Sequence, residues 1–450
     1  MASQDLTQGN IPSQLVRMTI PMFLGISSMI VAGMIETVYI GILGADQLAA
    51  YSFTFPLIMA LSSVSMGIGT GAASVIARAQ GQGDRRRVQV LTTHAMLLTL
   101  VLVVLLVMLG EWGQHRLFAA MGAEGRIQDL ISSYMRIWIL GLALFTLPMV
   151  ANTVLRAVGN AKVPGYVMTT TSGLQVILSP IVIFGLLGMP ALGFIGSAWA
   201  SIATGLVRTF GMLWVLVRQE RLIIVGKGSL DGLGESARTI LYIGFPSMLN
   251  SLIGPVSMAT TIWLLSQHGA QVVAAFGITS RFEMLVTMVL MSLSGSIGPF
   301  VGQNWGARKI DRIYSALSTA YRFCIVWGLV CFALLGPFGD NLVALVNDEP
   351  ALVEAAGWYL LLVPVSFGLL GIGMISGSTF VALGHPVPTT VLALLRMVVI
   401  YIPVAFLLNH FFGYIGIFCA TLIANLVMGC MAFLWSRRLL RQEITRIDMI

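Results

Sequence analysis

The sequence predicts an all-α polytopic membrane protein, in which twelve transmembrane helices form two parallel-repeat lobes of six helices with both termini in the cytoplasm. Three observations predict this fold class: a long series of apolar stretches, an uneven distribution of positive charge between successive loops, and an internal repeat. Of the 450 residues, 57% are hydrophobic and only 10% are charged, and the mean hydropathy is +0.91. Soluble domains carry about 25% charged residues, so we expect this chain in a lipid bilayer.

Apolar stretches of about 20 residues, enough to cross a bilayer as a helix, recur along the chain. The first six are predicted near 14–43, 48–76, 88–110, 128–155, 163–187 and 192–217. After the more polar linker RQERLIIVGKGSLDGLGES (218–236), six more follow near 238–266, 272–302, 313–337, 351–382, 387–409 and 414–436. These stretches are continuously apolar rather than alternating, which excludes a transmembrane β-barrel.

Positive charge predicts the orientation of these spans. Arg85, Arg86 and Arg87 lie in one set of loops with many other basic residues, whereas the opposite loops carry only Arg116 and Arg126. Loops rich in lysine and arginine stay in the cytoplasm, so we expect both termini there and the chain in the cytoplasmic (inner) membrane. This distribution accounts for the net charge of +7 without a nucleic-acid partner.

The two halves of the chain resemble each other at a constant offset of 225 residues. Matching pairs include Pro21 and Pro246, Gly81 and Gly306, Arg87 and Arg312, and Gly159 and Gly384. Six spans in each half give both halves the same orientation, and parallel repeats of this kind are typical of transporters with a substrate site between the repeats. We therefore predict an N-lobe (1–217), a cytoplasmic linker (218–236) and a C-lobe (237–450). Duplication for structure alone is the alternative interpretation.

Motifs for other function classes are missing from the sequence. There is no GxxxxGK[ST] phosphate loop, and the five histidines are dispersed without metal-ligand spacing. GIGTG (67–71) resembles a dinucleotide loop but lies within an apolar stretch, where close helix packing explains it better. We therefore expect no enzyme activity, catalytic residue, metal or cofactor, and the remaining energy source for transport is an ion gradient.

A single carboxylate lies within the first predicted span. Glu36 stands in SSMIVAGMIETVYIGILGA (27–45), with no charged residue nearer than Arg17 and Asp46. It lies roughly 10 Å from the outer end of the span at 1.5 Å per residue. An ionised side chain at a helix centre costs roughly 2.5–3.5 kcal/mol, and removal from water favours the neutral carboxyl. We interpret Glu36 as a proton-coupling group; the alternative is a carboxyl satisfied structurally by hydroxyl groups and water.

The second half of the chain lacks this acid, because the offset places Thr261 opposite Glu36. The seventh span instead carries Asn250, Ser257 and Thr261 at roughly helical spacing, a neutral polar stripe suited to lining a substrate cavity. The other cavity candidates from these spans are Tyr39, near Glu36, and the flexible thioethers Met284 and Met288. Ordinary packing is the alternative for the methionines.

Charged residues also lie within the spans of the second half. Arg281 and Glu283 are two residues apart and do not face each other on a helix. Arg322 and Arg396 lie in other spans of the same lobe. We predict a structural charge network of these four residues in the C-lobe, with direct coupling to the transported substrate or ion as the alternative.

Several segments together resemble the multidrug and toxic compound extrusion (MATE) family, and most closely its DinF-like branch. The resemblance covers nearly the whole chain and includes GMIETVYIGILGADQLAA (33–50), GQGDRRRV (81–88), LRAVGNAKVP (155–164), GFIGSAWA (193–200) and VGQNWGARKIDRI (301–313). It implies two six-helix lobes and alternating access, with a proton or sodium ion entering as an organic substrate leaves.

The sequence departs from the family pattern at the acidic positions. The family usually has aspartate where Glu36 stands, and many DinF-like members have an asparagine followed by an Asp-Pro pair in the fifth span. The corresponding residues here are Gln175, Ser179 and Pro180, so the second N-lobe acid is missing and the first two join the cavity candidates. This depleted set favours a proton over sodium as the coupling ion, although sodium stays open.

We therefore predict an ion-coupled antiporter that exports amphipathic, cationic organic compounds. Its expected partners are a small-molecule substrate and the lipid bilayer, and we expect a monomer. A flippase for lipid-linked or amphipathic metabolites is the alternative, and it depends on Arg281, Arg322 and Arg396 lining a lateral groove. A membrane-embedded enzyme or receptor is a third interpretation.

Overall fold

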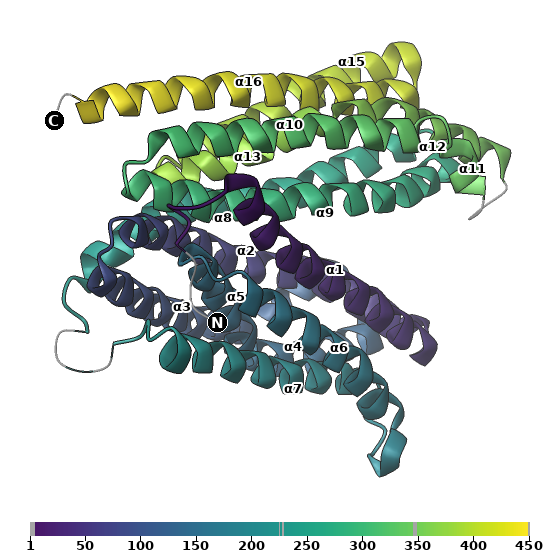
Figure 1. Ribbon diagram of the computed structural model, residues 1–450. Coiled ribbons are helices and arrows are strands. Elements are labelled where there is room, and N and C mark those ends of the chain that lie inside the picture. Colours follow the sequence, from purple (N-terminus) through teal and green to yellow (C-terminus); the bar gives the residue numbers. More distant parts are fainter. Residues whose placement is uncertain (1–4, 225, 227–228, 345–348, 449–450) are drawn as a thin grey trace. The chain divides into compact units, whose positions relative to one another are not determined.

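The protein is described by a computed structural model covering residues 5–224, 226, 229–344 and 349–448 (Figure 1). All secondary structure in these ranges is helical. Within these ranges, eleven helices are long and apolar enough to cross a membrane, and the bent pair α4 and α5 makes a twelfth if it is counted as one span. The predicted all-α polytopic class is confirmed, whereas the orientation of the termini stays a prediction.

The first half of the chain forms seven α-helices and two short helical turns. They are α1 (Ile11–Leu43), α2 (Ala45–Gly81), α3 (Arg85–Ala120), α4 (Gly125–Leu140), α5 (Leu142–Ala157), α6 (Lys162–Phe184), η1 (Leu186–Gly188), α7 (Gly193–Trp214) and the π-helical turn η2 (Val215–Gln219). The predicted span 128–155 is therefore two helices, which bend by 49° at the break that contains Gly141.

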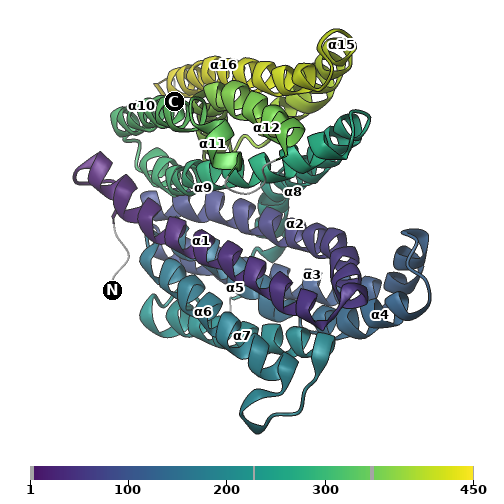
Figure 2. The same ribbon diagram turned by 90° about the vertical axis from the view of Figure 1, so that its right-hand side faces the viewer.

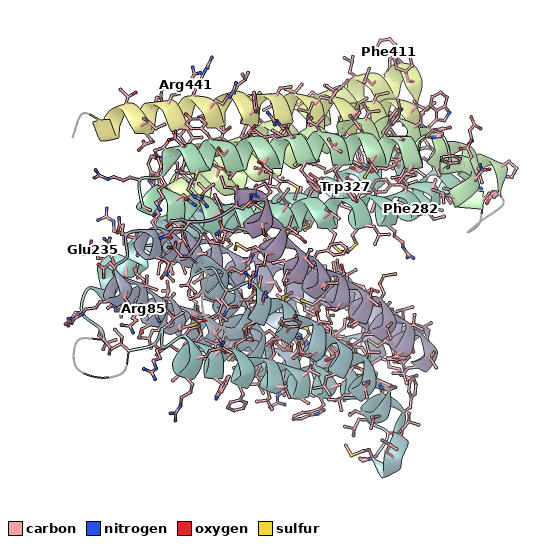
Figure 3. All side chains as sticks on the ribbon, viewed as in Figure 1. Arg85, Glu235, Phe282, Trp327, Phe411 and Arg441 are labelled. Atoms are coloured by element: carbon pink, nitrogen blue, oxygen red, sulfur yellow. The ribbon has the colours of Figure 1, made fainter. Side chains whose placement is uncertain are left out.

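The second half repeats this pattern with more breaks. Its elements are α8 (Leu233–Ser266), α9 (Ala270–Gly306), α10 (Ile310–Leu335), α11 (Gly339–Ala344), α12 (Pro350–Leu362), η3 (Val363–Ser366), α13 (Phe367–Leu383), α14 (Val387–Leu394), the π-helical turn η4 (Leu395–Tyr401), α15 (Ile402–Phe412) and α16 (Tyr414–Asp448). Within this half, Arg441 on α16 and Phe411 on α15 lie at opposite ends (Figure 3).

The described chain packs into two compact units. The N-unit contains Val16–Met248 and the N-terminal residues up to Gln8, and the C-unit contains Gly9–Leu15 and the chain from Leu249 onward. By packing, the boundary falls inside α8 rather than in the linker 218–236. The predicted functional division into lobes stays a prediction.

Close glycine contacts explain why the first half of α8 belongs to the N-unit. A Cβ atom on Gly71 of α2 would lie 2.2 Å from Ile240 O, and one on Gly67 would lie 2.6 Å from Gly244 O. The two helix backbones therefore approach more closely than any side chain at these positions would allow. The interpretation of GIGTG (67–71) as a packing motif is confirmed.

Hydrogen bonds from one arginine attach the first turn of α1 to the C-unit. The guanidinium of Arg312 donates to Gly9 O at 2.8 Å and to Gln14 Oε1 at 3.1 Å, while its Nε donates to Asn304 Oδ1 at 3.1 Å. Two of these hydrogen bonds attach residues 9–15 to the start of α10, and the third ties the same cation to the end of α9.

The linker between the two halves is attached to α3 within the N-unit. Residues 85, 89 and 93 share one face of α3 because they are four positions apart, and Arg85 lies at the end of the unit where the linker leaves (Figure 3). The contacts follow the same order on both segments: Arg85 donates to Glu220 O, Gln89 Nε2 to Arg221 O at 2.8 Å, and Ile224 N to Thr93 Oγ1 at 3.0 Å. Residues 225 and 227–228 of the predicted linker lie outside the described ranges.

Candidate coupling site in the N-unit

Glu36 lies in α1 and points toward α6. The residue is 7% exposed, and its Oε2 accepts a hydrogen bond of 2.7 Å from Nε2 of Gln175. Its other oxygen, Oε1, is buried and receives no hydrogen bond from any described residue. An ionised carboxylate in this position is half-satisfied and removed from water, which is an unfavourable state for a charge.

Gln175 is the centre of a small polar network between α6 and α7. Its Nε2 also lies 3.2 Å from Ser179 Oγ and 3.0 Å from Ser201 Oγ, and its Oε1 accepts from the Thr204 hydroxyl. A side-chain amide has only two N–H hydrogens for these three acceptors. One acceptor is therefore always left out, and the amide can exchange partners when the charge of Glu36 changes.

Glycine contacts bring the helices of this network together. A Cβ atom on Gly165 of α6 would lie 2.5 Å from Pro21 O of α1, and one on Gly196 of α7 would lie 2.9 Å from Val182 O of α6. α6 and α7 lie side by side along their length (Figures 1 and 2). The close approach of α6 and α7 lets Gln175 contact both Glu36 on α1 and the hydroxyl groups of α7.

Aromatic side chains of α2 and α4 lie in the neighbourhood of the acid. The rings of Tyr51 and Tyr134 meet edge to face at 6.1 Å, and Tyr134 stacks on Phe194 at 4.9 Å. Both tyrosines are within electrostatic range of Glu36. Tyr39, one turn beyond the acid, donates to Val176 O at 3.4 Å and packs its ring edge to face on Phe184.

The predicted polar stripe of the C-unit makes contacts with η4. Thr261 Oγ1 and Tyr401 OH are 2.6 Å apart, and Ser257 Oγ donates to Met397 Sδ at 2.7 Å. Asn250 is half-buried and makes no hydrogen bond to a described side chain. The stripe is therefore used at two of its three positions for packing α8 against a π-helical turn.

The two methionine candidates lie in different environments on α9. Met284 is 45% exposed, whereas Met288 is 3% exposed and buried inside the C-unit. Only Met284 has a free surface that a bilayer or a ligand could contact.

The structure brings together two of the four charged residues predicted to form a network. Tyr359 OH donates to Glu283 Oε2, and Arg396 is within electrostatic range of Glu283 without a direct ion pair at 4.0 Å or less among the described residues. The side chains of Arg281 and Arg322 are exposed and do not join them. Arg281 points elsewhere because residues two apart on a helix face different sides.

Sequence reasoning missed several members of these sites. Ser201 and Thr204 in the N-unit, and Tyr359 and Tyr401 in the C-unit, contact the predicted residues across helices that are far apart in the chain. The hydroxyl residues spaced along SAWASIATG (197–205) were an available signal for the first pair. No comparable sequence pattern pointed to Tyr359 or Tyr401.

Comparison with known proteins identifies the family. The MatE family model matches residues 21–181 and 246–407. The two matches begin 225 residues apart (246 − 21), which is the offset of the internal repeat. The chain is a MATE family transporter.

Relatives and solved structures cover nearly its full length. It is 32% identical to an FAD transporter of Shewanella oneidensis over 94% of each chain. It is 25% identical to a probable multidrug resistance protein, YoeA, of Bacillus subtilis over 90% of this chain and 89% of the other. The crystal structure of the Vibrio cholerae MATE transporter VcmN in the bent form matches with a TM-score of 0.91 and 28% identity, over 96% of this chain and 98% of the other.

These likenesses confirm several expectations for this MATE protein. Its fold is that of twelve-helix MATE transporters, and members of the family are transporters rather than enzymes. The interpretation as a membrane-embedded enzyme was therefore wrong. It is a multi-pass membrane protein of a family that exports drugs and other organic compounds. Membership of the DinF-like branch stays a prediction.

Proposed function

We propose that this MATE protein is a proton-coupled antiporter of the cytoplasmic membrane that exports amphipathic organic compounds as a monomer, with Glu36 as the group that binds and releases the proton. The observation that carries the proposal is the buried contact of 2.7 Å between Gln175 Nε2 and Glu36 Oε2. No arginine, lysine or histidine forms an ion pair with Glu36 among the described residues. The carboxyl can therefore change its charge without breaking a salt bridge.

Protonation of Glu36 rearranges the network in a defined way. The ionised carboxylate accepts from the Gln175 amide N–H, whereas a neutral carboxyl also has a hydrogen to donate. Rotation of the Gln175 amide by half a turn presents its oxygen to that hydrogen and its N–H group to the Thr204 hydroxyl, which can accept. Proton binding at α1 thereby changes hydrogen bonds on α6 and α7.

In the proposed cycle, protons from the outer side neutralise Glu36 and favour release of the exported compound outward. After the protein changes from outward-open to inward-open, Glu36 loses the proton to the cytoplasm and the next compound binds. One proton that moves down a membrane potential of 100 mV contributes about 2.3 kcal/mol. A pH gradient adds about 1.4 kcal/mol for each pH unit.

The polar groups near Glu36 favour a proton over sodium. Hard cations are held by several oxygen ligands, whereas the nearest polar contact of Glu36 is an N–H donor, and the Gln175 oxygen already accepts from Thr204. A sodium ion at the carboxylate would need at least these two hydrogen bonds to break.

Two substrate classes are supported by different relatives. Relatives named multidrug export or resistance proteins support amphipathic organic cations, for which an ionised Glu36 is a charge partner. The relative with 32% identity is named an FAD transporter, which supports an organic anion that carries phosphate. The flippase alternative has less support. Within the described ranges, no contact joins the three arginines on which it depends, Arg281, Arg322 and Arg396.

Reconstitution into vesicles tests the coupling. We expect vesicles that contain the native protein to exchange protons for a fluorescent amphipathic cation, such as ethidium. The rate of this exchange should be the same in the presence and absence of sodium. Glu36→Gln should abolish this exchange and Glu36→Asp should retain it. Glu283→Gln is the matched control, because Glu283 is the other acid well within a span, and it should retain exchange. Proton exchange by Glu36→Gln at the native rate would refute the mechanism.

A further inference from the structure

Two side chains on α5 direct hydrogen-bond donors at methionine sulfur atoms. Asn152 Nδ2 lies 2.9 Å from Met168 Sδ on α6, and Arg156 Nη1 lies 3.6 Å from Met22 Sδ on α1. The Nε of Arg156 is buried and has no partner among the described residues. Residues 152 and 156 are four positions apart, so both donors lie on one face of the helix. A thioether is only a weak acceptor, and the N-unit therefore contains a cluster of strong donors without a strong acceptor.

No acid in the described part of the N-unit forms an ion pair with this arginine. No charged side chain of the described ranges acts on Arg156, whose environment is dominated by removal from water. Glu36 lies 14 residues beyond Met22 on α1, which is roughly 21 Å at 1.5 Å per residue. Cations inside membrane proteins usually pair with an acid or face a substrate pathway, and pairing is not used here.

The internal repeat shows that the fold does not need these donors. At the offset of 225 residues, Gly377 stands opposite Asn152 and Val381 opposite Arg156, and α13 is continuous through both positions. Arg156 lies in the last turn of α5, where a cation favourably faces the helix carbonyl groups, yet α13 ends without a basic residue. The donor pair is therefore a property of the first repeat alone.

We propose that Asn152 and Arg156 bind the anionic group, a phosphate or carboxylate, of the compound that this protein exports. A guanidinium presents its N–H groups in a planar fork that matches these oxyanions, and Asn152 adds a donor one turn away. Met22 and Met168 have flexible side chains that can move aside and then pack on the apolar part of an organic anion. This inference rests on the proposed export function and assigns the substrate class to it.

The position of the site also separates the substrate from the proton. With roughly 21 Å of α1 between the two positions, an anion at Arg156 does not compete directly with a proton at Glu36. We therefore expect anion binding to persist in Glu36→Gln, which loses proton coupling.

Binding of two fluorescent compounds that differ by one phosphate tests the inference. Riboflavin 5′-phosphate and riboflavin share the same ring system, so the difference in their affinities reports recognition of the phosphate. We expect the native protein in detergent to bind the phosphate ester more tightly, and inorganic phosphate at millimolar concentration to compete. Arg156→Met should weaken binding of the ester about 10- to 100-fold, the range for loss of a hydrogen bond to a charged group, with little effect on riboflavin.

Control variants separate this role from a structural one. Arg208→Met removes a different, partly buried arginine of the N-unit, whose Nε donates to Thr171 Oγ1 at 3.3 Å, and should change ester binding less than twofold. Arg156→Lys keeps the charge but not the fork and should give an intermediate loss, which covers the case in which Arg156→Met does not fold. Equal affinity of the native protein for both compounds would overturn the inference, as would equal losses in the two methionine variants. Ethidium–proton exchange that depends on Glu36 would survive either result, so the two proposals fail separately.

Discussion

Substitution of Gly71 by alanine tests the packing of α2 against α8. The added Cβ would lie 2.2 Å from Ile240 O and 3.1 Å from Gly244 N. Non-bonded carbon atoms prefer separations of about 3.5–4.0 Å, so the two backbones must move apart locally by roughly 1 Å. Because the clash is with helix backbone, no side-chain rotation relieves it. Overpacking of this kind costs about 1–3 kcal/mol.

Thermal unfolding at a fixed scan rate in detergent measures this cost. At about 2–4 °C for each kcal/mol in a unit of this size, Gly71→Ala should lower the apparent Tm by roughly 2–12 °C. Gly33→Ala is the matched control, because a Cβ there meets no atom within 4 Å, and the higher helix propensity of alanine should leave its Tm unchanged or raised. Equal Tm values for the two variants would show that α2 and α8 do not pack as described.

Two further predictions concern the buried acid of the C-unit and the linker. Tyr359→Phe removes the hydroxyl that donates to Glu283 and should lower the free energy of unfolding by about 1–3 kcal/mol. Tyr401→Phe, which loses a contact between two neutral hydroxyls, should cost less in the same denaturation assay. Gln89→Leu removes the donor to Arg221 O and should speed cleavage by trypsin after Arg221, whereas an unchanged cleavage rate would contradict attachment of the linker to α3.

Much of the helical architecture could be predicted because a bilayer fixes the length and composition of a span. The predicted stretch 238–266 is α8 (Leu233–Ser266), and 313–337 is α10 (Ile310–Leu335). The bend of 49° within the predicted span 128–155 was missed. It depends on how α4 and α5 pack on other helices, and Gly141 fits tightly against Ile202 of α7. Hydropathy contains no information about such contacts.

The candidate site was predictable only in part. Glu36 stood out as a lone acid, and the family resemblance marked Gln175 only as a cavity candidate, whereas the structure makes it the hydrogen-bond partner of Glu36 at 2.7 Å. Thr204 was missed, because a threonine in an apolar helix usually bonds to its own backbone and gives no sign of a distant partner. Arg322 was assigned to a network that it does not join, since depth in the membrane does not fix the direction in which a side chain points.

The differences between the two repeats are more informative about function than their similarities. Pro21 and Pro246, like Arg87 and Arg312, occupy equivalent positions, and requirements shared by both copies of one fold explain such pairs. Those requirements cannot explain residues that one copy has lost or gained while keeping the helix. The position equivalent to Glu36 in the other repeat is Thr261, and the position equivalent to Arg156 is Val381, so neither charge is needed to build a repeat. The charge of Glu36 costs free energy in a membrane span. Both Glu36 and Arg156 lie in the N-unit, and each has a buried side-chain atom without a hydrogen-bond partner among the described residues. The simplest physical reason for keeping them is that each meets a partner which comes and goes: a proton at Glu36 and an oxyanion at Arg156.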